Sequence, residues 1–239
     1  MKQNGIQITY HHAAPGERGR ILLVMLPGAG FGQHDFTEHG FVRAVQERGL
    51  PVDVAVARPP MDRYLDGAVA GDIEQALIAP ARAQGYSRFW FLGISLGGMG
   101  ALLYARAAPA TVEGIILLAP FLGTPGLVSE IARAGGLASW EPGKIAASDV
   151  ERALLGWLKG FVAAPPAAPR LYLGYARGDR FVSGHLLLAE GLPPDRVLAI
   201  DGAHDWAAWT DMWRQMLDKD PFGQRGGAPR AALDQPERL

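Results

Sequence analysis

Ser95 stands in a glycine-rich pentapeptide that could present it as a nucleophile. Gly93 lies two residues before it and Gly97 two residues after it, in the pattern G-x-S-x-G. Glycines at these places make room for a tight turn in which the serine adopts a strained backbone conformation. The apolar run RFWFLG precedes the motif and LGGMGALLYARAA follows the serine, so the turn would join a strand to a helix N-terminus that favours developing negative charge. The alternative is a glycine-rich turn whose serine only caps the helix.

A serine hydroxyl is a weak nucleophile and needs a base. His204 is the best placed histidine, because it comes four residues after the last expected strand, in the sequence DGAHDW. The alternative is a loop histidine packed on Trp206. The other histidines lie before the core, after the first core strand or in an expected surface helix: His11, His12, His34, His39 and His185.

The base in turn needs an acid that orients its ring and stabilises the imidazolium. Asp179 comes four residues after an expected strand and gives the order Ser95, Asp179, His204, which is typical of one serine-hydrolase fold. Asp201 is a weaker rival. Asp205 is adjacent to the histidine and is better interpreted as the N-cap of the last helix. Asp179 could also cap the helix that follows it, and one carboxylate can fill both roles.

Acyl transfer also needs backbone donors for an oxyanion. The N–H of Leu96, directly after the serine, is one candidate. The second is expected in the glycine-rich loop PGAGFG that follows the first core strand, where Ala29 is the first choice and Gly30 the alternative.

Apolar runs alternate along the chain with segments of helical spacing. Helices are expected over residues 36–48, 66–84, 96–108 and 206–217, with Pro80 kinking or ending the second. Strands are expected over residues 6–10 (a leading edge strand), 20–26, 52–57, 88–93, 112–119, 170–175 and 196–200. The alternation predicts an α/β fold with a mostly parallel central sheet and helices on both faces. Ligands of such sheets bind beyond the carboxyl ends of the strands, and each candidate residue follows a strand.

Two segments depart from this alternation. Residues 121–169 separate two strands by more than one crossover helix and carry two short helical patches. We expect a small helical cap inserted into a single domain of residues 1–220, the alternative being two ordinary surface helices. Residues 221–239 are rich in Gly, Pro and Arg and are expected to form a mobile tail.

Together these motifs resemble the α/β-hydrolase superfamily over residues 20–217. The resemblance rests on the serine turn, the PGAG loop, the GDR acid loop and the GAHDW turn. The His-Asp-Trp run with Trp209 is similar to esterase and acyl-hydrolase members in particular. The resemblance implies a Ser-His-Asp triad, with no metal and no organic cofactor. One departure is Pro27, which stands where many members have a histidine before the glycine.

Composition argues against several other classes. A chain of 239 residues suits one large α/β domain or two small ones. The absence of cysteine excludes disulfides and a cysteine nucleophile. A net charge of −1 without basic runs argues against nucleic-acid binding. The N-terminus lacks a signal-peptide pattern and no apolar run approaches the ~20 residues of a membrane helix, so we expect a cytoplasmic protein without a membrane span.

These features predict a serine hydrolase that cleaves a small-molecule carboxylic ester or thioester through an acyl-enzyme. One alternative is an acyltransferase that uses the same triad. Another is a non-catalytic binding or signalling module on the same fold, because fold does not determine function. An apolar acyl pocket is predicted to be lined by aromatic side chains, each of which could instead serve core packing: Phe31, Tyr64, Phe121, Trp140, Trp157 and Trp206.

Overall fold

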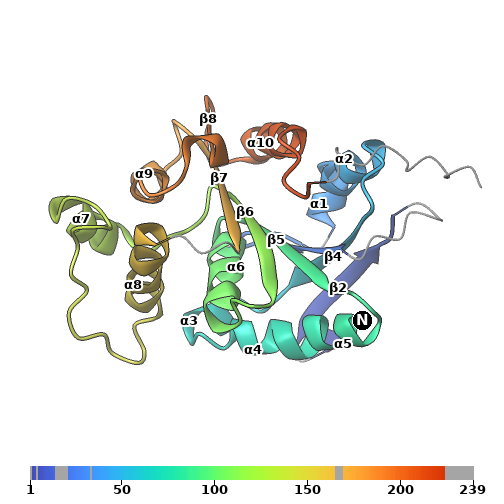
Figure 1. The fold of residues 1–239 in the computed structure, drawn as a ribbon, viewed down its shortest axis with the longest axis horizontal. Helices are drawn as coiled ribbons and strands as arrows, with labels where there is room; N and C mark the ends of the chain where they lie inside the picture. The colour runs from blue at the N-terminus through green and yellow to red at the C-terminus, as the bar shows by residue number, and fades with distance from the viewer. Residues whose placement is uncertain (1, 4, 14–20, 33, 165–168, 224–239) are drawn as a thin grey trace, which may run out of the picture.

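A computed structural model shows that the chain folds around one eight-stranded sheet (Figure 1). The structure describes residues 2–3, 5–13, 21–32, 34–164 and 169–223. The strand order is β1-β2-β4-β3-β5-β6-β7-β8. The strands are β1 (Lys2–Gln3), β2 (Ile6–His11), β3 (Ile21–Leu26), β4 (Val52–Arg58), β5 (Arg88–Ile94), β6 (Val112–Leu118), β7 (Arg170–Ala176) and β8 (Val197–Ile200).

The sheet is mostly parallel, as predicted. The pairs β1–β2 and β2–β4 are antiparallel, and the other neighbouring pairs are parallel. All seven strands expected from the sequence are present. The prediction that residues 6–10 form an edge strand is wrong, because Lys2 and Gln3 pair with the outer side of β2.

Strand β3 illustrates why the central strands are continuous apolar runs. All of its residues are buried, and they alternate between two hydrophobic clusters on opposite faces of the sheet. Leu22, Val24 and Leu26 enter one cluster, while their neighbours along the strand enter the other. Burial on both faces is characteristic of parallel sheets covered by helices.

Helices cover both faces of the sheet, as predicted (Figure 1). One face carries α1 (Asp35–Glu38), α2 (Phe41–Glu47) and α10 (Trp206–Asp218). The other face carries α4 (Val69–Ile73), α5 (Ala79–Ala83), α6 (Leu96–Ala107) and α9 (Val182–Ala189). A short helix, α3 (Asp62–Leu65), follows β4. In the described residues no helix is both long enough and apolar enough to span a membrane.

Two expected helices differ in detail. Residues 36–48 form two helices, because Gly40 adopts a φ of 76° between them. The segment 66–84 continues past Pro80 instead of ending there. A π-helical turn, Glu74–Ile78, precedes α5, and Pro80 lies in the first turn of α5. Pro80 has no N–H to donate, and the helical path is maintained through the wider π-helical turn that precedes it.

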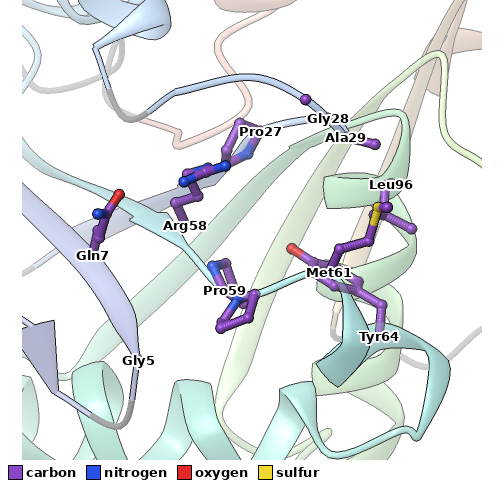
Figure 2. Close-up of a pocket in the computed structure, with 12 residues that line it drawn as sticks. Gly5, Gln7, Pro27, Gly28, Ala29, Arg58, Pro59, Met61, Tyr64 and Leu96 are labelled. Carbon is purple, nitrogen blue, oxygen red and sulfur yellow. The ribbon is translucent and has the colours of Figure 1, made fainter.

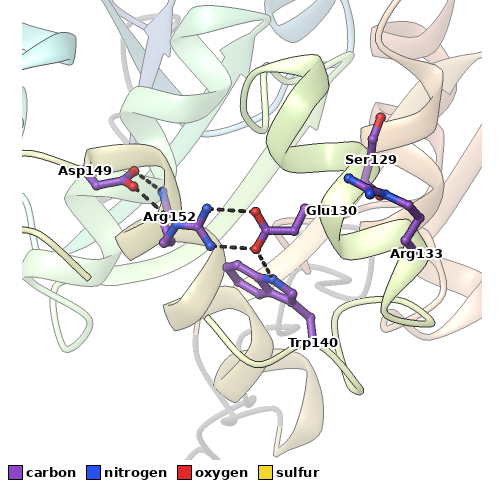
Figure 3. Close-up of polar contacts among 6 residues, drawn as sticks. All are labelled: Ser129, Glu130, Arg133, Trp140, Asp149 and Arg152. Carbon is purple, nitrogen blue, oxygen red and sulfur yellow. Dashed lines mark hydrogen bonds and ion pairs between the residues drawn. The ribbon is translucent and has the colours of Figure 1, made fainter. Parts of the chain in front are cut away.

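The segment 121–169 contains α7 (Pro125–Arg133) and α8 (Val150–Ala163), joined by a loop that one polar cluster ties together (Figure 3). Glu130 accepts two hydrogen bonds from Arg152, of 2.7 and 2.8 Å, and one of 2.8 Å from the indole of Trp140. These bonds lower the pKa of Glu130 to about 2. Asp149 caps α8 by accepting the backbone N–H of Arg152 at 3.0 Å. One carboxylate therefore connects both helices and the loop between them.

The hydrophobic core extends beyond residue 220. Phe222 is 1% exposed and its ring lies 5.0 Å from that of Trp90, edge to face. The predicted start of the mobile tail at residue 221 is therefore wrong, because Phe222 packs in the hydrophobic cluster on one face of the sheet. Residues 224–239 lie outside the described part of the chain.

Candidate active site

Ser95 lies at the turn between β5 and α6. Its φ of 51° places a non-glycine residue in the left-handed region, which is strained. The turn is held by strand β6 and the residues after it. The N–H of Ser95 donates to the Leu118 carbonyl at 3.2 Å, and its carbonyl accepts the N–H of Phe121 at 2.9 Å. These bonds hold the strained residue in place at the carboxyl edge of the sheet.

Glycines around Ser95 are required by close backbone approach. A Cβ atom at Gly97 would lie 2.0 Å from the carbonyl oxygen of Leu26 at the end of β3. A Cβ atom at Gly93 would lie 2.4 Å from the carbonyl oxygen of Gly97. Helix α6 can therefore begin directly against two strand ends, with its N-terminus beside the serine.

His204 lies within hydrogen-bonding distance of Ser95. Its Nε2 atom lies 3.1 Å from the Ser95 Oγ, although 109 residues separate them in the chain. The ring lies between Phe181 and Trp209 and is roughly perpendicular to each, with both centroids 5.0 Å away. The alternative predicted that His204 packs on Trp206, but the tryptophan that its ring contacts is Trp209. This packing limits rotation of the imidazole away from the serine.

Asp179 completes a hydrogen-bonded chain from the serine. Its Oδ2 accepts the His204 Nδ1–H at 2.7 Å, and its Oδ1 accepts the N–H of Phe181 at 2.8 Å. Burial opposes ionisation of this carboxyl, but the two hydrogen bonds outweigh it, so the pKa of Asp179 lies below its ordinary value. The prediction that Asp179 could also cap the following helix is wrong, because α9 begins at Val182 with Phe181 as its N-cap residue and has no side-chain cap.

The other acidic candidates lie elsewhere. Asp201 has a 94% exposed side chain and pairs with Arg177 at 2.9 Å. Asp205 accepts the N–H of Ala208 at 3.0 Å, which confirms it as the N-cap of α10. Burial and hydrogen bonding therefore single out Asp179 as the carboxylate that contacts the histidine.

Backbone contacts hold the aspartate and histidine loops together. The N–H of Gly178 donates to the Gly202 carbonyl at 3.0 Å, and the N–H of Arg177 donates to the Ile200 carbonyl at 2.8 Å. A Cβ atom at Gly178 would lie 2.6 Å from the Gly202 oxygen. The two loops consequently behave as one support for the pair of side chains.

The loop after β3 approaches the serine from the other side. A Cβ atom at Gly28 would lie 3.3 Å from the Cβ of Ser95. The N–H of Phe31 donates to the Gly28 carbonyl at 3.3 Å and closes a turn in which Ala29 and Gly30 are exposed. Leu96 is the first residue of α6, so its N–H has no intrahelical acceptor.

Comparisons with known proteins identify the architecture. The chain matches no sequence family model and no curated protein. Among solved structures, the S-formylglutathione hydrolase FrmB of Staphylococcus aureus superposes with a TM-score of 0.66 at 16% identity, over 88% of this chain and 91% of that one. The fluorophosphonate-binding serine hydrolase FphF of the same organism gives 0.64 at 15% identity, over 88% and 90%. Est1E of Butyrivibrio proteoclasticus gives 0.62 at 14% identity, over 92% and 97%. The chain has the α/β-hydrolase fold.

Two cavities share Leu96, the residue after Ser95, and Tyr64 in their walls, although Ser95 itself is in neither lining. The first, of about 280 Å³, is shown in Figure 2, and we call it the Arg58 cavity. Its lining is Gly5, Gln7, Pro27, Gly28, Ala29, Gly30, Arg58, Pro59, Pro60, Met61, Tyr64 and Leu96. The second, of about 430 Å³, is the cap cavity, and its lining is Tyr64, Leu65, Leu96, Met99, Phe121, Ala146, Ser148, Asp149, Val150 and Glu151.

The aromatic residues predicted to form an acyl pocket separate into two groups. Tyr64 lines both cavities and Phe121 lines the cap cavity. The other four line neither of these cavities. Phe31 and Trp206 contact each other edge to face at 5.2 Å. Trp140 is buried against the Glu130 cluster, and Trp157 packs on Phe161 at 5.3 Å.

Sequence reasoning placed one histidine wrongly and missed one cation. His185 was expected on a surface helix but is fully buried, because it lies on the face of α9 that packs into the core with Leu187 and Leu188. Its Nε2–H donates to the Pro120 carbonyl at 3.0 Å, and burial lowers its pKa. Arg58 was not considered, although it ends β4 at the same sheet edge as the other candidates.

Across the described ranges no three His, Asp or Glu side chains gather where a metal ion could bind.

Proposed function

We propose that this protein is a serine hydrolase that cleaves a carboxylic ester or thioester through an acyl-enzyme. The observation that carries the proposal is the continuous hydrogen-bonded chain from Ser95 to His204 to Asp179, with distances of 3.1 and 2.7 Å. The serine is strained and beside a helix N-terminus, which are the properties expected of an activated nucleophile.

In the first half of the reaction, the Ser95 Oγ attacks the acyl carbon while its proton passes to the His204 Nε2. Asp179 keeps the proton on Nδ1 and stabilises the imidazolium. The N–H groups of Leu96 and Ala29 donate to the tetrahedral oxyanion. Collapse then breaks the bond to the leaving oxygen or sulfur, and His204 gives its proton to the departing alcohol or thiol.

In the second half, water replaces the leaving group. His204 accepts a proton from the water as its oxygen attacks the acyl carbon, and the same N–H groups stabilise the second oxyanion. Collapse breaks the bond between the acyl carbon and Ser95, and the histidine returns the proton to the serine. The products are a carboxylic acid and the regenerated enzyme.

The solved structures with the same fold support this choice of chemistry through their names. They include a protein named as a fluorophosphonate-binding serine hydrolase and another named as an S-formylglutathione hydrolase. The triad geometry in the present chain gives the independent argument.

Covalent labelling with a fluorophosphonate probe tests the proposal. The wild type should be labelled and should release para-nitrophenol from para-nitrophenyl acetate. Ser95→Ala should lose labelling and at least about 10³-fold in turnover while remaining folded. Ser183→Ala, which alters an exposed serine of α9, is the matched control. Labelling of the Ser95→Ala protein at wild-type level contradicts the proposed nucleophile, and an unlabelled wild type favours a binding module.

A further inference from the structure

The two cavities that share Leu96 differ in the charged side chains on their walls. Among the described residues, the wall of the Arg58 cavity has one arginine and no carboxylate. Among the described residues, the wall of the cap cavity has no cation and two carboxylates: Asp149, which pairs with Arg152 at 3.3 Å, and Glu151, which accepts the N–H of Thr124 at 2.8 Å. Leu96, whose N–H is a proposed oxyanion donor, belongs to both walls. An ester bound at this N–H would therefore extend from the Arg58 cavity into the cap cavity.

Arg58 is exposed at the end of β4 and lines the cavity that carries its name. In the part of the chain that the structure describes, it makes no ion pair, side-chain hydrogen bond or ring contact. The next arginine along the chain behaves differently: Arg63 is bound by Asp72 at 2.6 Å and by Asp66 at 3.0 Å. Asp66 and Asp72 are thus directed to Arg63, and the guanidinium of Arg58 has no carboxylate partner among the described residues.

The surroundings of Arg58 add to its preference for an anion. Figure 2 shows its side chain between Gln7 and Pro27, at the start of the glycine-rich loop. Gln7, whose side chain carries an amide, lines the same cavity, as do the exposed residues Ala29 and Gly30. A guanidinium matches the planar carboxylate in a bidentate manner. A single cation without a second one nearby suits a singly charged group.

The cap cavity is suited to the opposite end of a substrate. Apart from its two carboxylates, its wall is formed mainly by apolar side chains, including Leu65, Met99 and Phe121. The carboxylates would repel an anion, and the apolar side chains would favour an uncharged hydrocarbon or aromatic portion. The difference in charged side chains between the two walls therefore orients an asymmetric ester.

We infer that the substrate is an ester or thioester that bears a carboxylate on one side of the scissile bond, bound by Arg58, and an uncharged apolar portion on the other. This inference rests on the proposed hydrolase function. Arg58 is a specificity-determining residue in this scheme, because it contacts the substrate away from the reacting atoms.

Matched pairs of esters test the inference on both sides of the bond. For the leaving group, the pair is para-carboxyphenyl acetate and its neutral methyl ester. For the acyl group, the pair is mono-para-nitrophenyl adipate and para-nitrophenyl hexanoate. Each kcat/KM is divided by the rate of hydrolysis by hydroxide, so that differences in intrinsic reactivity cancel. The wild type should prefer the anionic member of at least one pair by about tenfold, and added salt should reduce this preference.

Variants at Arg58 assign the preference to one side chain. Arg58→Gln should reduce the anionic-to-neutral ratio by about tenfold, chiefly through KM, Arg58→Lys should retain part of it, and Arg58→Glu should reverse it. Because the ratio is taken within one preparation, any shared loss of activity cancels. Arg106→Gln is the charge-matched control, since this exposed arginine lies near the far end of α6, about 16 Å from Ser95 along the helix axis.

The outcomes separate the two proposals. Hydrolysis of the neutral esters without an Arg58-dependent preference overturns the inference and leaves the hydrolase proposal standing. A ratio that falls equally in Arg106→Gln also overturns it, because the effect would then be that of net charge. Failure of every ester to react, together with absent probe labelling, removes the hydrolase proposal and the inference with it.

Discussion

Replacing Asp179 with asparagine changes one atom and should nearly abolish turnover. The carboxylate oxygen that accepts the His204 Nδ1–H at 2.7 Å becomes an NH₂ group or an amide oxygen. The Phe181 N–H, 2.8 Å from the other oxygen, keeps the amide oxygen on its own side. The NH₂ group therefore faces Nδ1 and donates to it. The imidazole proton then moves to Nε2, where it prevents the histidine from accepting the proton of Ser95.

The expected size of the loss in kcat follows from this change of tautomer. The pair is almost completely desolvated, with side-chain exposures of 0% for the aspartate and 7% for the histidine, so solvent cannot restore the productive form. A triad in which the wrong tautomer predominates loses about 10⁴-fold in kcat, which corresponds to about 5.4 kcal/mol of activation free energy. The stability loss should be smaller, about 1–3 kcal/mol, because a charge-assisted hydrogen bond becomes a neutral one.

Steady-state hydrolysis of para-nitrophenyl acetate measures the loss, and urea unfolding measures stability. Asp201→Asn is the matched control, because it makes the same chemical change on a side chain that is 94% exposed. The double variant Asp179→Asn/His204→Ala should be far less than additive, since both residues act on one proton transfer. A tenfold or smaller loss in Asp179→Asn, or a larger loss in Asp201→Asn, refutes the reasoning.

Two further predictions concern the frame around the site. Gly97→Ala should lower the free energy of unfolding by about 1–3 kcal/mol, because the new Cβ would lie 2.0 Å from the Leu26 carbonyl oxygen. Gly126→Ala, where no atom lies within 4 Å, should not do so, and equal urea midpoints for the two variants would contradict the proposed clash. The pKa of Glu130 is lowered from 4.5 to about 2, so its contribution to stability is present above about pH 4.5 and is lost as pH falls toward 2. Glu130→Gln should therefore flatten the dependence of Tm on pH in this acid window, and a variant as acid-sensitive as the wild type would disprove the link.

Local features of the sequence were sufficient for the fold and for the three proposed catalytic residues. Continuous apolar runs predicted strands buried on both faces, and the glycines around Ser95 predicted the turn that exposes it. Both signals are local, because a strand's burial and a turn's strain depend on residues within a few positions. The rule that chemistry follows strand ends then selected His204 and Asp179, which the structure places within hydrogen-bonding distance of one another.

The substrate-facing surroundings depended on the tertiary structure. Aromatic content predicted a pocket from six side chains, yet only Tyr64 and Phe121 reach the two cavities that share Leu96. The burial of His185, and the absence of a partner for Arg58 among the described residues, likewise follow from which elements pack together. Whether a side chain faces a cavity or the core depends on crossover paths and on partners remote in sequence. Tertiary packing therefore decided the shape and charge of the site, while the residue order alone indicated its chemistry.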